Sequence, residues 1–385
     1  MPHTLPSVAY ITNAGINSGV GQRALKVKEA LQELEVPLIE FNIDGNQGVV
    51  RRGDTTMFPL YHLPGPLGAK TITWIRLGRK VRYFLTTVSH HQLWHATNQT
   101  LSFVLERAVP AVVTVHDIIE LLEPQTPLSG LAARYLYSGI RRARHIITVS
   151  KYTSSTLQQY YGISAAKISV IPNGVGEEFH VIPDFKQTVG YLTLQQELKI
   201  RASNLVVLYV GSDHPRKNVV TAVRAFAQVA AHRPELVFLK VGEPGVASGR
   251  AALLQEIDRL GIQEKVRFVG QVTSAKLNEL YNLAAMLLYP SRFEGFGLPP
   301  LEALAAGTPV LTANTTALPE VVGRAALLRS PSDTAGFAHD IEQLLAQPAL
   351  ARELRTRGLA RARQFSWKAA AQQELDVYRQ VVDEG

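Results

Sequence analysis

The sequence predicts an α/β fold in which two doubly wound parallel sheets form two lobes that face each other across a cleft. The chain has 385 residues, whereas a single domain typically has about 150, so we expect more than one domain. Short β-branched runs alternate with amphipathic stretches along most of it. Pro172, Gly174, Gly176 and Pro183 interrupt this alternation, as expected of a hinge. We therefore expect residues 1–176 to form a first lobe, residues 177–365 a second, and residues 366–385 a terminal helix that packs back across the boundary.

The first lobe is predicted from short strands and amphipathic helices. Ala24, Val27, Leu31 and Leu34 recur at helical spacing, which predicts a helix over residues 21–34. A second helix is predicted over residues 129–144. The predicted strands cover residues 7–12, 37–41, 111–115, 146–149 and 168–171. This alternation is typical of a parallel α/β sheet.

The second lobe is predicted from continuous apolar runs, which are typical of strands covered on both faces. Val219, Val223, Phe226 and Ala230 recur at helical spacing and predict one crossover helix, and residues 251–260 predict another. Ser366 can cap a last helix over residues 367–382. The predicted strands cover residues 205–210, 236–241, 266–269, 286–289 and 309–312. In such open sheets, ligands bind at the carboxyl ends of the strands.

The composition excludes several classes of protein. Hydrophobic residues make up 46% of the chain and charged residues 19%, which excludes a disordered or coiled-coil protein. The chain has no cysteine, so disulfides, thiolate metal sites and cysteine nucleophiles are excluded. No signal-peptide core or run of about 18 apolar residues is present, so we expect a cytoplasmic protein. The net charge of +8 leaves nucleic acid, an anionic lipid surface or a small anionic substrate open as partners.

The most informative segment runs from residue 289 to residue 323. A predicted strand ends at Tyr289 and a glycine-rich loop follows, and Pro299 and Pro300 then suit the first turn of a helix. Amides at Gly297 and Leu298 would point forward from that helix and bind phosphate. Glu294 and Glu302 lie eight residues apart, and two carboxylates can accept hydrogen bonds from the vicinal hydroxyls of a sugar. Taken alone, an isolated pair of this kind is more often a solvated surface pair.

A second candidate site follows the predicted strand over residues 205–210. The loop carries Arg216 and Lys217 directly before a helix that Asn218 can cap. Two cations beside a helix start form an anion site, and at the same sheet edge as the Gly297 loop they would hold a diphosphate from the other side. An exposed basic turn is the equally weighted alternative for this loop on its own.

In the first lobe, the loop after the opening strand contains Gly19 and Gly21, which allow the backbone to approach a ligand closely. It lacks the spacing of the dinucleotide-binding fingerprint. His116 and Asp117 follow the strand over residues 111–115, where a side chain can face the cleft. A lone histidine is more often a core residue, but this position favours a functional one.

These motifs resemble the retaining glycosyltransferases of family 4, whose two-lobed architecture is called GT-B. The match is strongest where GSDHPRKN, EGFGLPPLEALAAGTPV and LPEVVG appear in order, and looser in the first lobe through SGVG, HATN, VVTVHD and IPNGV. The resemblance implies that Arg216, Lys217, Glu294 and His116 are catalytic. It implies donor binding by Gly19, Gly21, Ser212, Val272, Phe296, Gly297, Leu298 and Glu302, with Glu302 on the ribose and Val272 under the base. It implies weaker acceptor contacts at Asn98 and Asp117.

The function expected from this resemblance is transfer of a hexose, mannose or glucose, from a nucleotide-diphosphate sugar with retention of configuration. The donor would be of the GDP-mannose or UDP- or ADP-glucose type. The acceptor would be a sugar, a lipid-linked glycan or a small molecule. We expect no cofactor and no metal ion, because fixed cations can stabilise the leaving diphosphate and no D-x-D pair is present.

Two alternatives stay open at this point. A nucleotide-sugar 2-epimerase shares the two-lobed architecture and could use the same diphosphate site. A basic nucleic-acid-binding protein is the alternative from another class, although we expect no nucleic-acid partner. Lys70, Arg76, Arg79, Lys80 and Arg82 interleave with apolar residues, so residues 70–88 predict a basic amphipathic helix. That helix is either simply solvated or a peripheral contact with an anionic membrane.

Overall fold

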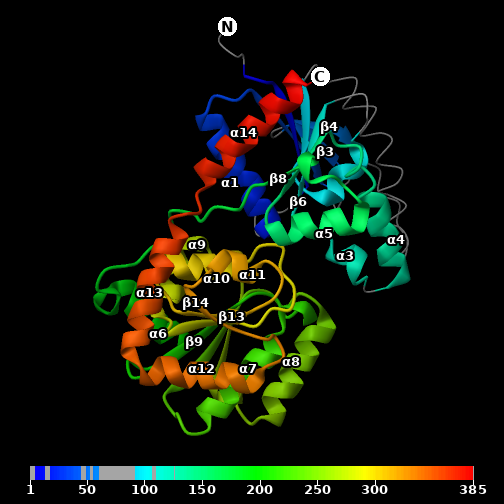
Figure 1. Cartoon of the computed structure of the whole chain (residues 1–385). Coiled ribbons are helices and arrows are strands. Elements are labelled where there is room, and N and C mark those ends of the chain that lie inside the picture. Colours follow the sequence, from blue (N-terminus) through cyan, green and yellow to red (C-terminus); the bar gives the residue numbers. More distant parts are fainter. Residues whose placement is uncertain are drawn as a thin grey trace. The chain divides into compact units, whose positions relative to one another are not determined.

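The computed structural model consists of two compact units, each an α/β sheet with helices (Figure 1). It describes residues 5–13, 18–44, 49–52, 55–59, 92–105, 110–124 and 126–384. Unit 1 comprises residues 1–174 and 367–385, and unit 2 comprises residues 175–366. The predicted basic helix over residues 70–88 lies outside the described residues.

Unit 1 contains an eight-stranded sheet in the order β4-β3-β2-β1-β5-β6-β7-β8. Strands β2, β1, β5, β6, β7 and β8 pair in parallel. At one edge, β3 pairs antiparallel with β2, and β4 pairs antiparallel with β3. The strands are β1 Val8–Thr12, β2 Leu38–Asp44, β3 Val49–Arg52, β4 Thr55–Pro59, β5 Leu93–Ala96, β6 Ala111–Val115, β7 His145–Thr148 and β8 Ile168–Val170. The α-helices are α1 Gly19–Glu33, α3 Ile119–Leu122, α4 Pro127–Leu136, α5 Lys151–Tyr161 and α14 Trp367–Asp383, with 3-10 turns η1 Gln99–Val104 and η2 Ala165–Lys167.

Unit 2 contains a six-stranded parallel sheet in the order β11-β10-β9-β12-β13-β14. In Figure 1, α7 and α12 lie on one face of this sheet, and α9, α10 and α11 lie on the other. The strands are β9 Leu205–Val210, β10 Leu236–Val241, β11 Val266–Val269, β12 Met286–Tyr289, β13 Val310–Ala313 and β14 Ala326–Arg329. The helices are α6 Val189–Leu198, α7 Val219–Ala230, α8 Ala247–Arg259, α9 Ser274–Leu283, α10 Leu298–Ala305, α11 Leu318–Val322, α12 Thr334–Ala346 and α13 Pro348–Ala362, with η3 Phe185–Gln187, η4 Pro215–Lys217 and η5 Gln263–Lys265.

The predicted α/β class with two doubly wound sheets is confirmed, and the buried apolar strands of unit 2 fall where the apolar runs place them. Several local predictions are wrong. The predicted helix over residues 129–144 ends at Leu136, because Gly139 lies against the backbone of η1, where a Cβ would be 1.6 Å from the Ser102 carbonyl oxygen. Helix α1 begins at Gly19 rather than Gly21, because Ser18 caps it by accepting a hydrogen bond from the Gly21 amide. Strands β3, β4, β5 and β14 were not predicted, since they are short and carry polar residues.

The C-terminal helix α14 belongs to unit 1, where it lies beside α1 (Figure 1). Its apolar residues recur at helical spacing and form a core with α1 and the sheet. Within this core, the carboxylate of Glu374 pairs with the guanidinium of Arg23 at 2.5 Å, and Arg23 also donates to Asn173 Oδ1 at 2.9 Å. The hydroxyl of Tyr378 lies 2.6 Å from His95 Nδ1 and donates to Glu374. Helix α14 is therefore held by a buried polar network as well as by apolar packing.

We predict that Glu374→Ala lowers the free energy of unfolding of unit 1 by about 3–5 kcal/mol, because it leaves the Arg23 charge buried without a carboxylate to balance it. Asp376→Ala is the matched control on the same helix. Its ion pair with Arg379 is exposed, so we expect a loss of at most about 1 kcal/mol. All three tryptophans fall within the residue ranges of unit 1, so tryptophan fluorescence during urea unfolding measures both effects. Equal losses in the two variants would contradict the assignment.

Candidate active site

The candidate site lies where the sheet of unit 2 changes its winding direction. Strands β9 and β12 are neighbours although two strands separate them in sequence, with β10 and β11 on one side and β13 and β14 on the other. Doubly wound sheets bind their ligands at the carboxyl edge of such a switch point. Here the loops that leave the two strands are residues 211–218 and 290–297. These loops carry Arg216, Lys217 and Glu294.

Lys217 and Glu294 form the centre of the site. The ammonium of Lys217 donates to both oxygens of the Glu294 carboxylate, at 2.7 and 2.9 Å, and to the Tyr289 hydroxyl at 3.0 Å. The Tyr289 hydroxyl in turn donates to Glu294 Oε1 at 2.6 Å. Glu294 is only 6% exposed, whereas the Lys217 side chain is 16% exposed. The structure therefore brings together two of the predicted residues, with the ammonium on the more accessible side.

Arg216 joins this pair more loosely. Its guanidinium lies 3.8 Å from Glu294 Oε2 and donates a hydrogen bond to the Phe293 carbonyl at 3.2 Å. The two loops are also joined through backbone, because the Arg292 amide donates to the Arg216 carbonyl at 2.8 Å. The prediction that the Asn218 side chain caps α7 is wrong: it bridges loops by donating to the carbonyls of Pro290 and Pro331.

The electrostatics of the site favour an ionised Glu294. Burial alone would raise the pKa of its carboxyl, but the charges of Lys217 and Arg216 and the hydrogen bonds from Lys217 and Tyr289 outweigh it, so the pKa is lowered. Burial, together with the charge of Glu294, raises the pKa of Tyr289 well above its ordinary value. At neutral pH the site thus holds a carboxylate, an ammonium and a neutral phenol.

The neighbouring strand β13 fixes the backbone around Glu294. The Glu294 amide donates to the Thr316 hydroxyl at 3.1 Å, and Thr316 lies in the loop after β13 with a positive φ of 53°. The Thr312 hydroxyl, at the end of β13, donates to the Tyr289 carbonyl at 2.8 Å. The carboxylate of Glu294 therefore projects from a backbone that is held on two sides.

Helix α10 begins directly after this loop, as the prolines predict. Gly297 precedes it with φ 108°, and a Cβ there would lie 2.7 Å from the side chain of Leu318. Pro299 and Pro300 occupy the first turn and have no N–H group. The amides of Gly297 and Leu298 are thus the donors that this helix start can offer an anion. Because the helix start is poor in donors, an anion here depends more on the cations of the neighbouring loop.

Glu302 lies further along α10 and is half-buried. The Tyr281 hydroxyl of α9 donates to its Oε2 at 2.9 Å. Burial raises the pKa of Glu302 to about 7, the hydrogen bond from Tyr281 opposes this, and the charge of Glu178 adds to it. Glu302 is therefore a carboxyl that changes its charge near neutral pH, in contrast to Glu294.

The other predicted donor residues of unit 2 follow the same sheet. Ser212 lies in the loop after β9, and its carbonyl accepts a long hydrogen bond of 3.4 Å from the Tyr209 hydroxyl. Val272 is half-buried in the loop after the edge strand β11. Phe296 is buried, with its ring 5.8 Å from that of Phe365 in an edge-to-face arrangement.

In unit 1, the predicted residues have mainly structural partners. Asn98 is buried and caps η1, accepting from the Thr100 amide at 2.9 Å while donating to Asn13 Oδ1 at 2.6 Å. Asp117 accepts from the Ile119 amide at the start of α3. Gly19 and Gly21 lie in the first turn of α1, and the Gly21 amide already donates to Ser18.

His116 follows β6, as predicted, but it is 6% exposed. Its Nε2 lies 3.1 Å from the Thr97 carbonyl oxygen, so this nitrogen carries a proton. Burial, with a contribution from the charge of Arg23, lowers the pKa of His116 to about 3. The imidazole is therefore neutral at physiological pH and presents Nδ1 as an acceptor.

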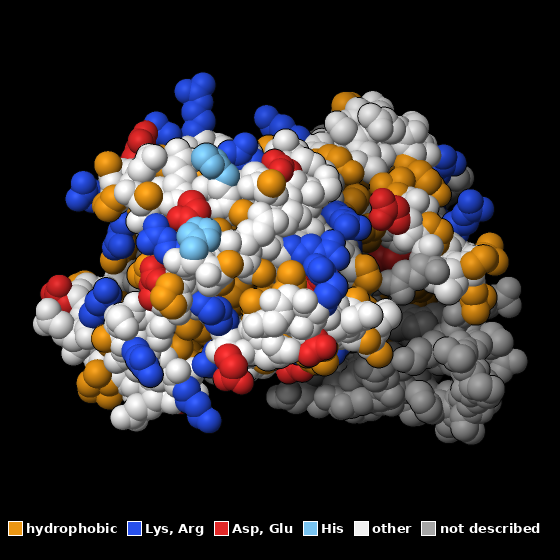
Figure 2. All heavy atoms as spheres, turned by 90° about the horizontal axis from the view of Figure 1, so that it is seen from below, with side chains coloured by type: hydrophobic (Ala, Val, Ile, Leu, Met, Phe, Trp, Pro, Cys, Tyr) orange, Lys and Arg blue, Asp and Glu red, His pale blue; other side chains and the backbone are white. Residues whose placement is uncertain are grey.

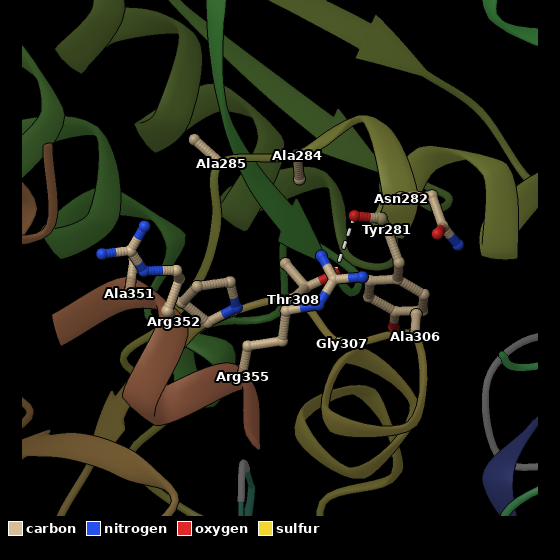
Figure 3. A pocket seen from close by; sticks show the side chains of 11 residues that line it. Tyr281, Asn282, Ala284, Ala285, Ala306, Gly307, Thr308, Ala351, Arg352 and Arg355 are labelled. Carbon is tan, nitrogen blue, oxygen red and sulfur yellow. Dashed lines mark hydrogen bonds between the residues drawn. The ribbon is translucent and has the colours of Figure 1, made fainter. Parts of the chain in front are cut away.

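A separate pocket of about 240 Å³ lies at the opposite edge of the unit 2 sheet (Figure 3). Its walls include Ala285, which precedes β12, and Pro309, which precedes β13. The side chains of Arg352 and Arg355 extend over it from α13 (Figure 3). Because this pocket is at the amino ends of the strands, the loops with Lys217 and Glu294 do not line it.

Two residues of the site were not predicted from the sequence. Tyr289 ends an apolar strand, and the pattern marks it as core. Thr316 carries no motif. The Tyr289 hydroxyl meets Lys217 and Glu294 because the loops after β9 and β12 fold against each other in the tertiary structure.

The described residues contain no group of three or more His, Asp or Glu side chains that could hold a metal ion. Within the same residues, no helix has the length and apolar character needed to cross a bilayer.

Comparison with known proteins identifies relatives of both units. A family model described as "Glycosyl transferases group 1" matches residues 192–361, and one described as "Glycosyltransferase Family 4" matches residues 17–179. O-antigen chain mannosyltransferase B from Escherichia coli is 31% identical over 296 residues, covering 74% of each chain. A serotype-specific mannosyltransferase, WbdA, from the same species is 28% identical over 294 residues, covering 75% of this chain but only 36% of that relative. The chain therefore spans about a third of the length of WbdA.

Among solved structures, a sucrose-phosphate synthase from Thermosynechococcus elongatus shares the fold with a TM-score of 0.80. It is 23% identical, and the match covers 99% of this chain and 100% of that chain. This likeness confirms the GT-B fold that the sequence motifs imply.

We predict that Glu302 makes the stability of unit 2 depend on pH. The folded protein holds the Glu302 proton up to a pKa of about 7, above the ordinary value of 4.5, so stability is lost as the pH rises from 4.5 through 7. Glu302→Gln cannot titrate and keeps an acceptor for Tyr281. Between about pH 5 and pH 8, its melting temperature by circular dichroism should fall less than that of the wild type. A parallel fall in both proteins would show that Glu302 is not the titrating group.

Proposed function

This chain belongs to the family 4 glycosyltransferases, and we propose that it is a retaining mannosyltransferase that uses a nucleotide-diphosphate sugar as its donor. Sugar transfer itself follows from the family. The names of the two mannosyltransferase relatives favour mannose over glucose, the two hexoses that the sequence motifs left open. Their O-antigen and serotype-specific roles support a growing polysaccharide as the acceptor.

The observation that carries this proposal is the placement of Lys217 at the switch point of the unit 2 sheet. Its ammonium is held by Glu294 and Tyr289 beside the start of α10, and the guanidinium of Arg216 is nearby. A diphosphate bound there would gain two cations and the amides of Gly297 and Leu298. Charge-assisted bonds of this kind each contribute about 1.5–3 kcal/mol.

This arrangement suits the charge that develops during sugar transfer. The bond between the anomeric carbon and the phosphate oxygen breaks, and the leaving diphosphate gains negative charge while the sugar becomes oxocarbenium-like. The acceptor hydroxyl then forms the new bond from the same face, and its proton passes to the leaving phosphate oxygen. Fixed cations at that phosphate stabilise the transition state more than the ground state. We therefore propose that no metal ion or cofactor is required.

The two carboxylates would bind hydroxyl groups in different parts of the donor. Glu294 Oε1 already accepts from Lys217 and Tyr289, whereas Oε2 has its one close hydrogen bond from Lys217, so Oε2 is the oxygen we assign to the sugar hydroxyls. We assign the ribose hydroxyls to Glu302. Val272, Ser212 and Phe296 would complete the donor site through the base and the backbone.

Unit 1 is proposed to bind the acceptor. The resemblance to the family assigns His116 to the donor sugar, where its neutral Nδ1 would accept a hydrogen bond, and Gly19, at the start of α1, to the leaving phosphate. Asn98 and Asp117 are weaker candidates because they cap local structure. A cytoplasmic location with peripheral membrane contact through residues 70–88 remains part of the proposal.

Transfer is favoured over the two alternatives that the sequence left open. An epimerase needs acid and base groups beside the sugar, whereas a pKa lowered to about 3 makes the His116 imidazole a weak base, and its Nε2 proton is bound to a carbonyl. On the face shown in Figure 2, the described lysine and arginine side chains are spread among acidic, apolar and neutral ones. This distribution does not favour a nucleic-acid-binding face there.

We predict that Lys217→Ala lowers the rate of sugar transfer by about 10²–10³-fold, because it removes one fixed donor to the leaving diphosphate. The rate is measured as release of nucleoside diphosphate at saturating donor. Lys186→Ala, at an exposed lysine of the same unit, is the control and should retain the wild-type rate. An unchanged rate in Lys217→Ala would remove this residue from the mechanism.

We also predict that the correct donor stabilises unit 2 against heat. GDP-mannose, UDP-glucose and ADP-glucose are compared at equal concentrations by thermal shift, and GDP-mannose should give the largest increase in melting temperature. Glu302→Ala should reduce that increase, because the ribose hydroxyls lose their acceptor. If none of the three shifts the wild type, the assignment of the donor class is wrong.

A further inference from the structure

We propose that Asp213 is a positioning residue, whose ion pairs with Lys240 and Arg250 hold the loop of Arg216 and Lys217 where the donor diphosphate binds. This inference rests on the proposed function, because it acts through the two cations. It concerns three residues to which neither the sequence motifs nor the relatives assign a role.

Asp213 connects the site loop to two other elements. Its Oδ1 lies 2.7 Å from the ammonium of Lys240 in β10, and its Oδ2 lies 2.6 Å from Nε of Arg250 in α8. The side chains of Asp213 and Lys240 are 0% and 1% exposed, and that of Arg250 is 23% exposed. The loop is thus attached through one buried carboxylate to the strand next to β9 and to a helix.

A buried lysine in the middle of a sheet is unusual and costly. Burial lowers the pKa of Lys240, and the hydrogen bond and charge of Asp213 oppose this effect. Lys240 also donates to the carbonyls of Gly242 at 2.7 Å and Glu243 at 3.1 Å. Buried ion pairs are often no more stabilising than apolar side chains of similar size. We therefore attribute this pair to the geometry it imposes on the loop.

The backbone of the loop that carries Asp213 is also in direct contact with the segment after β10. The Asp213 amide donates to the Pro244 carbonyl at 2.9 Å. A Cβ on Gly249 would lie 1.8 Å from the Asp213 carbonyl oxygen, so only glycine fits there. The carboxylate and the backbone of Asp213 are therefore anchored to the same neighbouring segment, residues 240–250.

The connection from Asp213 to Lys217 is short and stiff. Pro215 restricts the backbone, and the Lys217 amide donates to the His214 carbonyl at 2.8 Å. At the far end, the buried Tyr209 hydroxyl donates to the Lys217 carbonyl at 3.0 Å. A shift of the backbone at Asp213 is thus carried to the two cations, and catalytic geometry is sensitive to shifts of about 1 Å.

The test is a kinetic cycle of Asp213→Asn and Lys217→Ala, singly and together. It uses the full chain, the donor with the largest thermal shift, and a temperature at which circular dichroism shows every variant folded. In the wild-type background, Asp213→Asn should lower kcat by about 10–100-fold with a smaller change in KM. In the Lys217→Ala background, the same change should lower kcat by a clearly smaller factor, because only Arg216 is left to be positioned.

Glu256→Gln is the matched control, because Glu256 is another buried carboxylate of unit 2 with two cationic partners, Arg224 at 2.7 Å and Arg259 at 2.6 Å. It should lower the melting temperature and leave kcat unchanged. If Asp213→Asn does not fold, Arg250→Met replaces it in the cycle, since Arg250 is the more accessible partner. The same non-additive loss of kcat is then expected, at a smaller size.

The outcomes separate the two proposals. A loss of kcat by Asp213→Asn that is equal in both backgrounds, or matched by Glu256→Gln, overturns the positioning role. An unchanged kcat in Asp213→Asn, with Lys217→Ala slowed, overturns the positioning role alone. An unchanged kcat in Lys217→Ala overturns the assigned role of Lys217 and the positioning role with it. Absence of transfer from every donor by the wild type overturns the proposed function.

Discussion

The carboxylate of Glu294 and the ammonium of Lys217 meet between the ends of two neighbouring strands, and the buried carboxylate depends on its cationic neighbours to stay charged. Burial acts to raise the pKa of Glu294, and the charges of Lys217 and Arg216, with the hydrogen bonds from Lys217 and Tyr289, reverse this. The pair requires β9 and β12 to be adjacent, and this adjacency exists only because the sheet changes its winding direction between them. The site therefore depends on the topology of unit 2.

This topology also explains which groups of the site can bind an anion. Helix α10 begins with two prolines, so its first turn offers few N–H groups to an anion. The loop after β9 supplies the positive charge instead, and its position is fixed by Tyr209, by the loop after β12 and by the buried carboxylate of Asp213. A preorganised cation costs little reorganisation during the reaction, which is the main source of electrostatic catalysis.

Sequence patterns predicted an element correctly where a single local property, such as a continuous apolar run, determines it. The apolar runs located β9, β10 and β12 because these strands are covered on both faces, and the Gly297 motif located the start of α10. Short strands such as β3 lack a long apolar run, and the early end of α4 depends on contact between Gly139 and a distant backbone. In the site, Lys217 and Glu294 were found from motifs. The roles of Tyr289 and Asp213, in contrast, depend on contacts with Lys217 and Lys240, which lie far away in the sequence. Such long-range contacts leave no local pattern.

The most direct test of the account is a crystal structure of the full chain with the nucleoside diphosphate of its donor. The account predicts the diphosphate within hydrogen-bond distance of the Lys217 ammonium and the Gly297 and Leu298 amides, with the ribose hydroxyls on Glu302. A diphosphate bound instead at the opposite edge of the sheet, against Arg352 and Arg355, would contradict it.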